Sequence, residues 1–364
     1  MRAKLPITLA IAAALCACGC SDEPSTLPGS TDGTGEGVEF ADATVDDSGD
    51  RGEVTTENIR DFNICAYKST EYYDIVMNNV EVVRTGPNRW YYTPQVMWPD
   101  YALTFIAVSP ASIEIHVNPW WHNVFRYEPD DAKTDVVVCV KPDAVQTGGR
   151  LKLNFRHALS RVDISAICDI PNLRVKVKEM RLYHVCHGSE FMFPSTSTSD
   201  RNVTGQLDDC WPEYSNNWME VPYYTSEEGS EMVLGATPQS LDTEDNLFYI
   251  PFRFTQLTWD GSYIRGSSMR FVCHFEDAET GEQIWPTDDT PYPLLPGGRP
   301  GYWGYVYVPL QDGSGSMRWL PGINYHYTVN LREGGKLPPM PSDTSTGRSS
   351  DSGGNTVTVS GQPY

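Results

Sequence analysis

The sequence lacks the features that mark several large classes of protein. It has no Gly-rich phosphate loop, no Gly-x-Ser-x-Gly motif and no His-Glu-x-x-His motif, so the common catalytic signatures are missing. Long amphipathic helical patterns are almost absent between residues 51 and 331. Basic residues are few, with 27 Lys and Arg against 48 Asp and Glu, and the net charge is −21. A surface this acidic repels nucleic acid and anionic lipid, so we expect a protein that is neither an enzyme nor a nucleic-acid binder.

The N-terminus has no apolar run long enough to cross a bilayer as a helix. Arg2 and Lys4 precede an apolar run at residues 5–15, whereas a spanning helix needs about 20 residues. This pattern is typical of a secretory signal peptide, which we place at residues 1–17. Loss of its two basic residues changes the net charge from −21 to −23.

A cysteine at the end of this signal indicates lipidation. Leu15-Cys16-Ala17-Cys18 fits the Leu-x-Ala-Cys pattern at which bacterial lipoprotein peptidase cuts before the cysteine. Acyl chains such as palmitate on Cys18 would then hold the protein on a membrane. Cys20 competes as the lipidated residue, but Ala17, three places before it, fits the pattern less well than Leu15. An ordinary signal peptide with incidental cysteines is the remaining alternative.

The six cysteines beyond Cys20 are not paired at short spacing. They lie at positions 65, 139, 168, 186, 210 and 273. Several fall inside apolar, strand-like runs such as 136–140 and 164–168, so we expect most of them to be buried free thiols. Export permits disulfides, but the sequence does not say which cysteines would meet.

The remaining chain is longer than one hydrophobic core usually serves, which predicts two domains. Residues 18–37 are rich in Gly, Ser, Thr and acidic residues, and we interpret them as a disordered tether. Short β-rich runs between turn signals follow, as is typical of β-sandwiches. We therefore predict an all-β protein with two tandem β-sandwich domains at 38–195 and 196–332, divided at the Pro- and Ser-rich stretch 194–202.

Alternation of apolar and polar residues marks the individual strands, with one face of each strand buried. The expected strands are 62–67, 80–83, 103–108, 113–117 and 151–155 in the first half, and 232–234, 248–252, 269–275 and 325–331 in the second. Residues 38–45 form a further expected strand that pairs with the first domain. Pro251 indicates an edge position for its own strand.

The C-terminal segment, 333–364, combines a linker with one more strand pattern. Residues 333–354 are almost entirely Gly, Pro, Ser, Thr, Asp and a few charged residues, which predicts a flexible linker. Thr356-Val357-Thr358-Val359 then alternates Thr with Val, the pattern of a strand with one apolar edge. The linker is long enough to carry this strand to another molecule. Plain disorder of the tail is the alternative, because only Val357 and Val359 supply apolar area.

Two clusters are candidate ligand sites. Trp120 and Trp121 are the most suggestive pair among ten tryptophans and twenty tyrosines, because exposed aromatic rings stack on sugars or grip protein partners. Paired sandwiches also bury many aromatics in their cores. His184-Val185-Cys186-His187 is the densest cluster of metal-type residues. A zinc site needs about four ligands and no second short-spaced pair exists, so we expect no metal and no cofactor.

Several separated segments resemble the fimbrillin family of surface lipoproteins. In the family's order, they are 38–40, 50–67, 90–94, 98–110, 155–162 and 319–329. Phe155-Arg156-His157-Ala158-Leu159 is similar to a Phe-x-His-Ala-Leu signature of the family, and Trp319-Leu320-Pro321-Gly322 precedes its closing strand. Each motif alone is weakly specific, but the ordered set spans most of the chain beyond the tether.

The resemblance implies two sandwiches of transthyretin-like type and export as a lipoprotein to the cell outer membrane, exposed at the surface. It also implies assembly into an adhesive pilus after an arginine-specific protease removes the first strand. The cut would follow Arg51, and residues 356–359 of a neighbouring pilin subunit would fill the groove, since an unpaired strand edge favours pairing. An ordinary solvated arginine is the alternative for Arg51.

Two alternatives to a stalk subunit remain open. One is an anchor or tip subunit of the same family, which stays lipidated or caps the fibre. The other is a surface glycan- or peptide-binding lipoprotein that does not polymerise. Polymerisation needs a cleavable first strand and a donor strand, whereas a binding lipoprotein needs a preformed aromatic pocket.

Overall fold

A computed structural model of the protein describes residues 36–45, 54–118, 123–128, 134–194, 207, 209–213, 217–242, 248–299, 301–315, 317–340 and 354–363. Residues 36–364 form one compact unit. The predicted signal peptide, nearly all of the tether, Cys18, Arg51, Trp120 and Trp121 lie outside the described residues. In the described ranges, no helix is long and apolar enough to cross a membrane.

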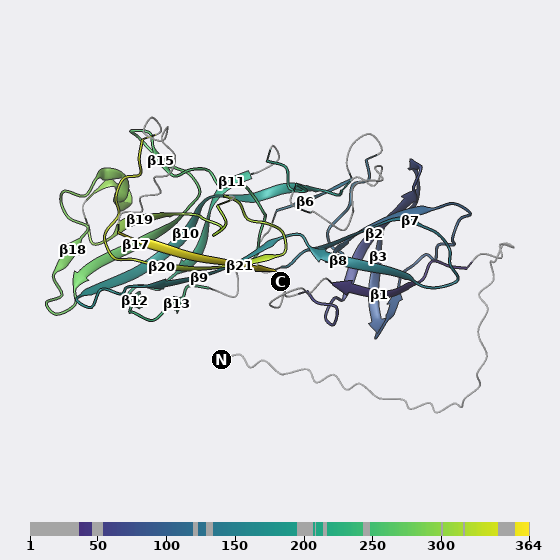
Figure 1. The fold of residues 1–364 in the computed structure, drawn as a ribbon, viewed down its shortest axis with the longest axis horizontal. Coiled ribbons are helices and arrows are strands. Elements are labelled where there is room, and N and C mark those ends of the chain that lie inside the picture. Colours follow the sequence, from purple (N-terminus) through teal and green to yellow (C-terminus); the bar gives the residue numbers. More distant parts are fainter. Residues whose placement is uncertain are drawn as a thin grey trace, which may run out of the picture. The chain divides into compact units, whose positions relative to one another are not determined.

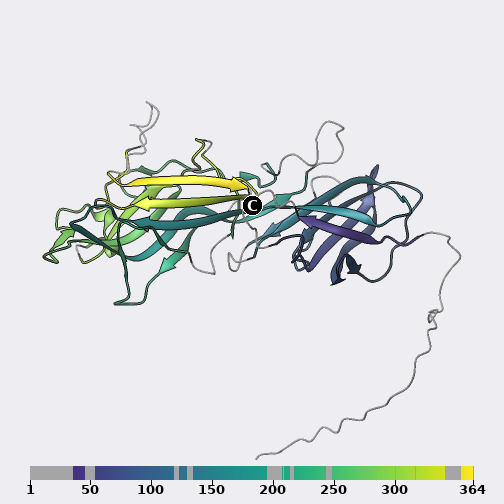
Figure 2. The same cartoon turned by 60° about the horizontal axis from the view of Figure 1, so that its bottom comes forward.

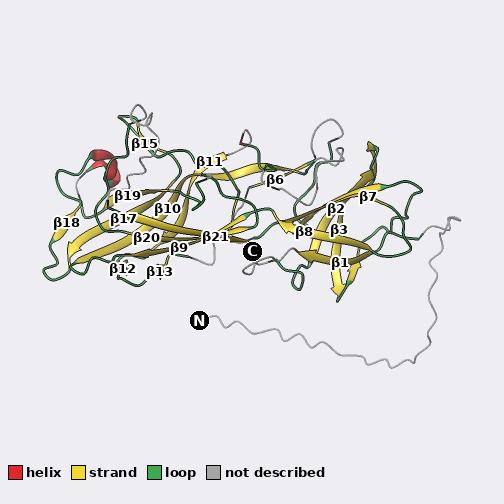
Figure 3. Cartoon of the chain, in the orientation of Figure 1, coloured by secondary structure: helices red, strands yellow, loops and turns green. Residues whose placement is uncertain are grey.

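The chain is an all-β protein with two tandem sandwiches, as predicted (Figure 1). Among the described residues the helical positions are two short 3-10 turns, η2 (Tyr292–Leu294) and η3 (Pro296–Gly298), and the 3-10 residue Glu213, and strands make up the remaining regular structure (Figure 3).

Seven strands form the sheet of the first sandwich, in the order β1-β8-β7-β5-β2-β3-β4. They are β1 (Phe40–Val45), β2 (Asp61–Lys68), β3 (Glu71–Gly86), β4 (Arg89–Tyr91), β5 (Leu103–Ser109), β7 (Val137–Ala144) and β8 (Leu151–His157). The two end strands of this order, β1 and β4, contact each other, so the sheet curls around its core. Phe62 lies at the centre of that core, with its ring centroid 5.7 Å from that of Phe40 and 5.3 Å from that of Phe155.

Two facing sheets form the second sandwich. One has the order β11-β10-β17-β18, with β6 and β12 also paired to β10 and β19 paired to β17; the other has the order β13-β9-β20-β21, with β14 also paired to β9. The strands are β6 (Val124–Tyr127), β9 (Ser160–Ile167), β10 (Leu173–Met192), β11 (Asn217–Thr225), β12 (Met232–Leu234), β13 (Gln239–Ser240), β14 (Phe248–Tyr249), β17 (Ser268–Asp277), β18 (Gln283–Trp285), β19 (Gly304–Pro309), β20 (Ile323–Asn330) and β21 (Thr356–Pro363). A separate hairpin pairs β15 (Thr258–Trp259) with β16 (Ile264–Arg265). Inward side chains of both sheets, such as Ile164, Phe271 and Tyr327, share one buried cluster.

The burial pattern along each strand reflects which of its faces meets a core. In β8 and β9 buried residues alternate with more exposed ones, as expected of strands with one face toward a core. Every residue of β5 is buried, because one face of the strand belongs to the first core, with Leu103, Phe105 and Ala107, and the other face to the second, with Ile106 and Val108. Most expected strands are found, although β14 ends at Tyr249, before Pro251.

The strand expected at 113–117 is wrong. These residues make only one isolated bridge, from His116 to Val124. The Asn79 side chain takes the place of a strand partner: its Oδ1 accepts a hydrogen bond from Ile115 N at 2.7 Å, and its Nδ2 donates to Ile115 O at 2.8 Å. A side chain that satisfies the backbone in this way competes with a sheet ladder.

The division between the sandwiches follows strand pairing. We expected it at residues 195 and 196. The strands β9 and β10, which precede that point, pair with β20 and β17 of the second sandwich. We therefore propose that the division falls between β8 and β9, although the earlier strand β6 also pairs with β10 of the second sandwich.

The six cysteines of the described residues are all buried and free, which confirms the expectation of buried thiols. Burial raises the pKa of Cys65 to about 11 and the pKa of Cys139 and Cys186 to about 12. Thiols of this kind are unreactive near neutral pH, because the thiolate is the nucleophile.

Candidate functional site

The first strand, β1, forms one edge of the first sheet and runs parallel to β8. Phe40 is opposite Leu151 and Val45 is opposite Phe155, with a bulge between Phe40 and Ala43. The bulge inserts an extra residue and so changes which side chains point inward. A strand that replaced β1 would therefore have to match this irregular register.

Val38 and the inward side chains of β1 are deeply buried. Val38 is 0% exposed, Phe40 4%, and Ala43 and Val45 5% each. The Phe40 ring packs against Phe62 and, at 5.5 Å between centroids, against Tyr92. Burying one large apolar side chain is worth about 1.5–3 kcal/mol, so β1 is a substantial part of the first core.

Hydrogen bonds to residues 92–96 also hold the chain just before β1. Val38 N donates to Val96 O at 2.8 Å, and Val38 O accepts hydrogen bonds from Tyr92 OH at 2.7 Å and Gln95 Nε2 at 3.0 Å. Removal of this segment would leave these groups without their partners, in addition to the unpaired edge of β8.

The predicted processing residue, Arg51, is flanked by two anchored positions. Val45 N donates to Thr56 Oγ1 at 2.9 Å, and Val54 N donates to Asp135 Oδ2 at 3.3 Å. Residues 46–53, which include Arg51, lie outside the described residues. The structure thus describes the strand that a cut would release and the chain that would remain.

The predicted donor strand forms β21, which pairs antiparallel with β20 of the same chain (Figure 2). The pairing runs without interruption from Thr356 opposite Asn330 to Pro363 opposite Ile323. In the described part of the chain, no strand pairs with the outer edge of β21. The sequence pattern indicated a strand but not this partner within the chain.

The two terminal strands differ sharply in how much apolar side-chain surface they bury. In β21 only Val357 and Val359 are partly buried against the core, and its other residues are exposed. β1 instead buries three apolar side chains almost completely. Detachment of β21 therefore exposes far less apolar surface than detachment of β1.

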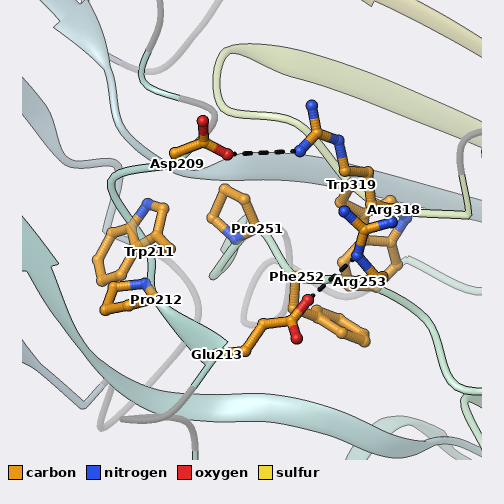
Figure 4. A pocket seen from close by; sticks show the side chains of 9 residues that line it. All are labelled: Asp209, Trp211, Pro212, Glu213, Pro251, Phe252, Arg253, Arg318 and Trp319. Atoms are coloured by element: carbon orange, nitrogen blue, oxygen red, sulfur yellow. Dashed lines mark hydrogen bonds and ion pairs between the residues drawn. The ribbon is translucent and has the colours of Figure 1, made fainter.

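A small pocket in the second sandwich is partly lined by aromatic side chains (Figure 4). Its volume is about 210 Å³, and Trp211, Phe252 and Trp319 are among its lining residues. Trp211 Nε1 donates to Ala158 O at 2.7 Å and Trp319 Nε1 donates to Tyr327 OH at 2.9 Å. Both tryptophans are at least 95% buried, so their rings serve the core and do not offer an open face.

The rim of this pocket carries two ion pairs. Arg253 Nε lies 3.1 Å from Glu213 Oε1, and an Arg318 guanidinium nitrogen lies 3.9 Å from Asp209 Oδ1. Surface pairs of this kind contribute about 0–1 kcal/mol. The rim charges balance one another, so the pocket has no marked preference for an ion of either sign.

The metal-type cluster at 184–187 is a structural part of β10. His184 packs against the Trp218 ring at 4.8 Å, and Cys186 Sγ donates to Gly188 O at 3.5 Å. Across the described ranges, no group of three or more His, Cys, Asp or Glu side chains is placed to hold a metal ion.

The sequence comparison identifies the family. A model of the fimbrillin-like family matches residues 46–231, which is just over half of the chain. The chain therefore belongs to the fimbrillin-like family. Its class is that of fimbrial, or pilus, subunits of the cell surface, and it is not an enzyme.

Several solved structures resemble the chain at low sequence identity. The fimbrilin FimA of Porphyromonas gingivalis W83 is 11% identical, with a TM-score of 0.42, covering 90% of this chain and 97% of that one. The tip fimbrial protein Mfa3 of the same species is 12% identical, with a TM-score of 0.38 and coverage of 84% and 94%. The fimbrial anchor protein Mfa2 is 12% identical, with a TM-score of 0.30 and coverage of 90% and 97%. No curated protein sequence matches the chain.

Proposed function

We propose that the protein is a structural subunit of an adhesive pilus, exported as a lipoprotein acylated at Cys18 and anchored in the outer membrane. An arginine-specific protease then cuts after Arg51 and releases β1. The resulting groove accepts β21 of a neighbouring subunit. The observation that carries this proposal is the contrast between the two edge strands, of which β1 is deeply buried and β21 is lightly held.

Release of β1 creates a strong acceptor. The groove would expose the ring of Phe62, the side chain of Tyr92 and the backbone edge of β8. Unsatisfied backbone groups and exposed apolar surface together favour addition of a strand. Cleavage is therefore the step that makes the subunit competent to assemble.

The donor segment matches only part of this groove. Val357 and Val359 are two residues apart, the same spacing as Ala43 and Val45 beyond the bulge. In the direction of β1, Gly354 and Asn355 precede Val357 near the place of Phe40, and in the opposite direction Gly361 follows Val359 there. In neither direction does an apolar donor side chain fill the place of Phe40. A donor that supplies fewer apolar groups cannot displace an intact β1, so cutting has to precede exchange.

The test uses the chain without its signal peptide, before and after cutting with an arginine-specific protease. We expect the uncut protein to elute as a monomer and the cut protein to form a ladder of oligomers. Deletion of residues 356–364 should abolish the ladder without preventing the cut, and Arg51→Ala should prevent the cut.

Two variants of β21 distinguish a loss of side-chain packing in the groove from a general effect of mutating the strand. Val359→Asp places a charge at a partly buried position and should block assembly, whereas Thr358→Ala changes an exposed position of the same strand and should not. If the cut protein stays monomeric in the presence of an intact β21, a stalk role is wrong, and the anchor or tip role becomes the better proposal.

A further inference from the structure

A cluster of aromatic and basic side chains lies on the outer face of the sheet that contains β10, β17 and β19. Its members are Arg174, Lys176 and Lys178 of β10, together with Tyr302 and Trp303, which directly precede β19. Their neighbours Val175 and Val177 point into the core, and the basic side chains point out. We call these five residues the aromatic-basic shelf.

The two aromatic rings of the shelf stand nearly perpendicular to each other. The Tyr302 ring is stacked on His274, with 3.6 Å between the centroids and 9° between the planes. One ring face is therefore covered by the imidazole, and Tyr302 is 45% exposed as a residue, so the solvent-accessible part of the ring is its other side and its edge. Trp303 stands at 79° to this ring with its centroid 4.9 Å away.

A lysine side chain lies beside each of the two rings. Lys176 Nζ donates to Tyr302 OH at 3.1 Å, and Lys178 Nζ lies 5.7 Å from the centre of the Trp303 ring. Arg174 and Lys176 each lie 2.9 Å from an oxygen of Glu276.

The shelf differs in charge from the rest of the molecule. Glu231 is a second nearby acid, and Lys176 and Lys178 are among the groups that lower its pKa, after hydrogen bonds from backbone N–H groups. Three cations thus face two acids, in a chain whose net charge is −21. An anionic ligand is therefore attracted here and repelled by most of the remaining surface.

Hydrogen bonds to the backbone of residues 301 and 302 fix the position of the shelf. His274 Nδ1 donates to Tyr302 O at 2.9 Å, and Gln283 Nε2 donates to Gly301 O at 3.2 Å. The side chains of His274 and Glu276 are 1% and 6% exposed. Aromatic and basic groups held in advance in this way lose little freedom when a ligand binds.

We propose that the aromatic-basic shelf binds an acidic glycan, through a sugar that carries a carboxylate or a sulfate. The solvent-accessible side of the Tyr302 ring can stack on the C–H face of a sugar ring, and Trp303 can bound that ring at one side. The ammonium groups of Lys176 and Lys178 can form charge-assisted hydrogen bonds with the anion. This site lies in the second sandwich, and its use does not depend on strand exchange.

The test measures binding to the uncut monomer by isothermal titration calorimetry. The probes are oligogalacturonate, which carries carboxylates, and dextran sulfate, with neutral dextran as the uncharged control. We expect one or both anionic probes to bind and neutral dextran not to bind. The affinity should also fall in 0.5 M salt, because exposed charges are then screened.

Matched variants connect binding to the shelf. Lys178→Gln should weaken binding by about tenfold, the lower end of the effect expected for a hydrogen bond to a charged group. Tyr302→Ala should weaken binding by about threefold to tenfold through loss of the stacked ring. Tyr302→Phe keeps the ring and should bind nearly as well as the natural sequence. Tyr263→Ala, at a residue 67% exposed on the β15–β16 turn, and Lys152→Gln on β8 are the controls and should bind normally.

The following outcomes would overturn the proposal. Absence of binding to both anionic probes would do so, as would equal losses in the shelf variants and the controls. If the shelf variants instead alter self-association in sedimentation experiments without altering glycan binding, the shelf is a protein interface. The unfolding midpoint of each variant shows whether a loss of binding comes from misfolding.

Discussion

The Asn355 side chain joins the start of β21 to Arg332, just beyond the end of β20. Asn355 Oδ1 accepts a hydrogen bond from the backbone N–H of Arg332 at 2.8 Å, and a second from that of Glu333 at 3.1 Å. Asn355 is 2% exposed. It thus holds β21 at the end next to the linker, where Val357 and Val359 contribute the only partly buried apolar side chains of the strand.

Replacement of Asn355 by alanine should loosen β21. The substitution leaves the N–H groups of Arg332 and Glu333 without their side-chain acceptor, and one buried unsatisfied group costs about 1–3 kcal/mol. We expect hydrogen exchange in a peptide covering 356–363 to accelerate by about tenfold or more, measured by mass spectrometry.

The control for this variant is Gln362→Ala, at an exposed position of the same strand. It should leave exchange in β21 nearly unchanged. If Asn355→Ala exchanges at the natural rate, the side chain is not what retains β21. Faster exchange in every strand would instead indicate global destabilisation.

Replacement of Phe40 by alanine should strongly destabilise the first sandwich. The ring is 4% exposed and packs between Phe62 and Tyr92, and loss of a buried Phe side chain costs about 3–5 kcal/mol. The free energy of unfolding is measured by urea titration. The neighbouring variant Glu39→Gln removes only an exposed pair with Arg150, worth about 0–1 kcal/mol, so the two variants should differ clearly. Similar losses would show that Phe40 is not a main anchor of β1.

The native protein should resist alkylation at its cysteines. All six cysteines of the described residues are buried, and burial raises the pKa of several thiols to about 11 or 12. At pH 8, iodoacetamide should modify a chain that begins after Cys20 slowly in the native state and should add six groups after unfolding in urea, as counted by mass. Rapid labelling of the native protein would contradict the buried positions of these thiols.

Local patterns in the sequence were sufficient to predict many strands. The alternation of Leu151, Leu153 and Phe155 predicted β8, and the β-branched and aromatic residues of 38–45 predicted β1. The pattern failed at 113–117 because the Asn79 side chain, far away in the sequence, satisfies the backbone of Ile115. Such a contact has no signature in the local alternation.

The partners of the strands could not be predicted in the same way. β1 pairs in parallel with β8, and β9 with β20, across more than a hundred residues of chain. The alternation of Val357 and Val359 shows that the tail can form a strand, but the outer edge of β20 and an empty groove in another subunit offer the same backbone hydrogen bonds. In the proposed mechanism, relative burial and cleavage decide which of them β21 occupies, and the local pattern contains neither.

Acidification below pH 6.5 should destabilise the fold through two histidines of the second sandwich. Burial lowers the pKa of His184 and His274 from the usual value of 6.5, although hydrogen bonding to Tyr302 O and the charge of Glu276 partly oppose the shift at His274. In the unfolded chain both imidazoles titrate near about 6.5. Between that pH and the lower folded values, the unfolded state binds more protons, so the free energy of unfolding falls as the pH falls.

Urea unfolding at pH 7.5 and pH 5.5 measures this effect. The carboxyl groups with lowered pKa values, such as Glu276 and Asp169, titrate below this window, so their contribution stays constant. His184→Gln should be less sensitive to pH than the natural sequence, because it removes one of the two titrating groups. His116→Gln, at an exposed position, should keep the full sensitivity. Equal stability of the natural sequence at the two pH values would show that the folded state does not hold these imidazoles in the neutral form.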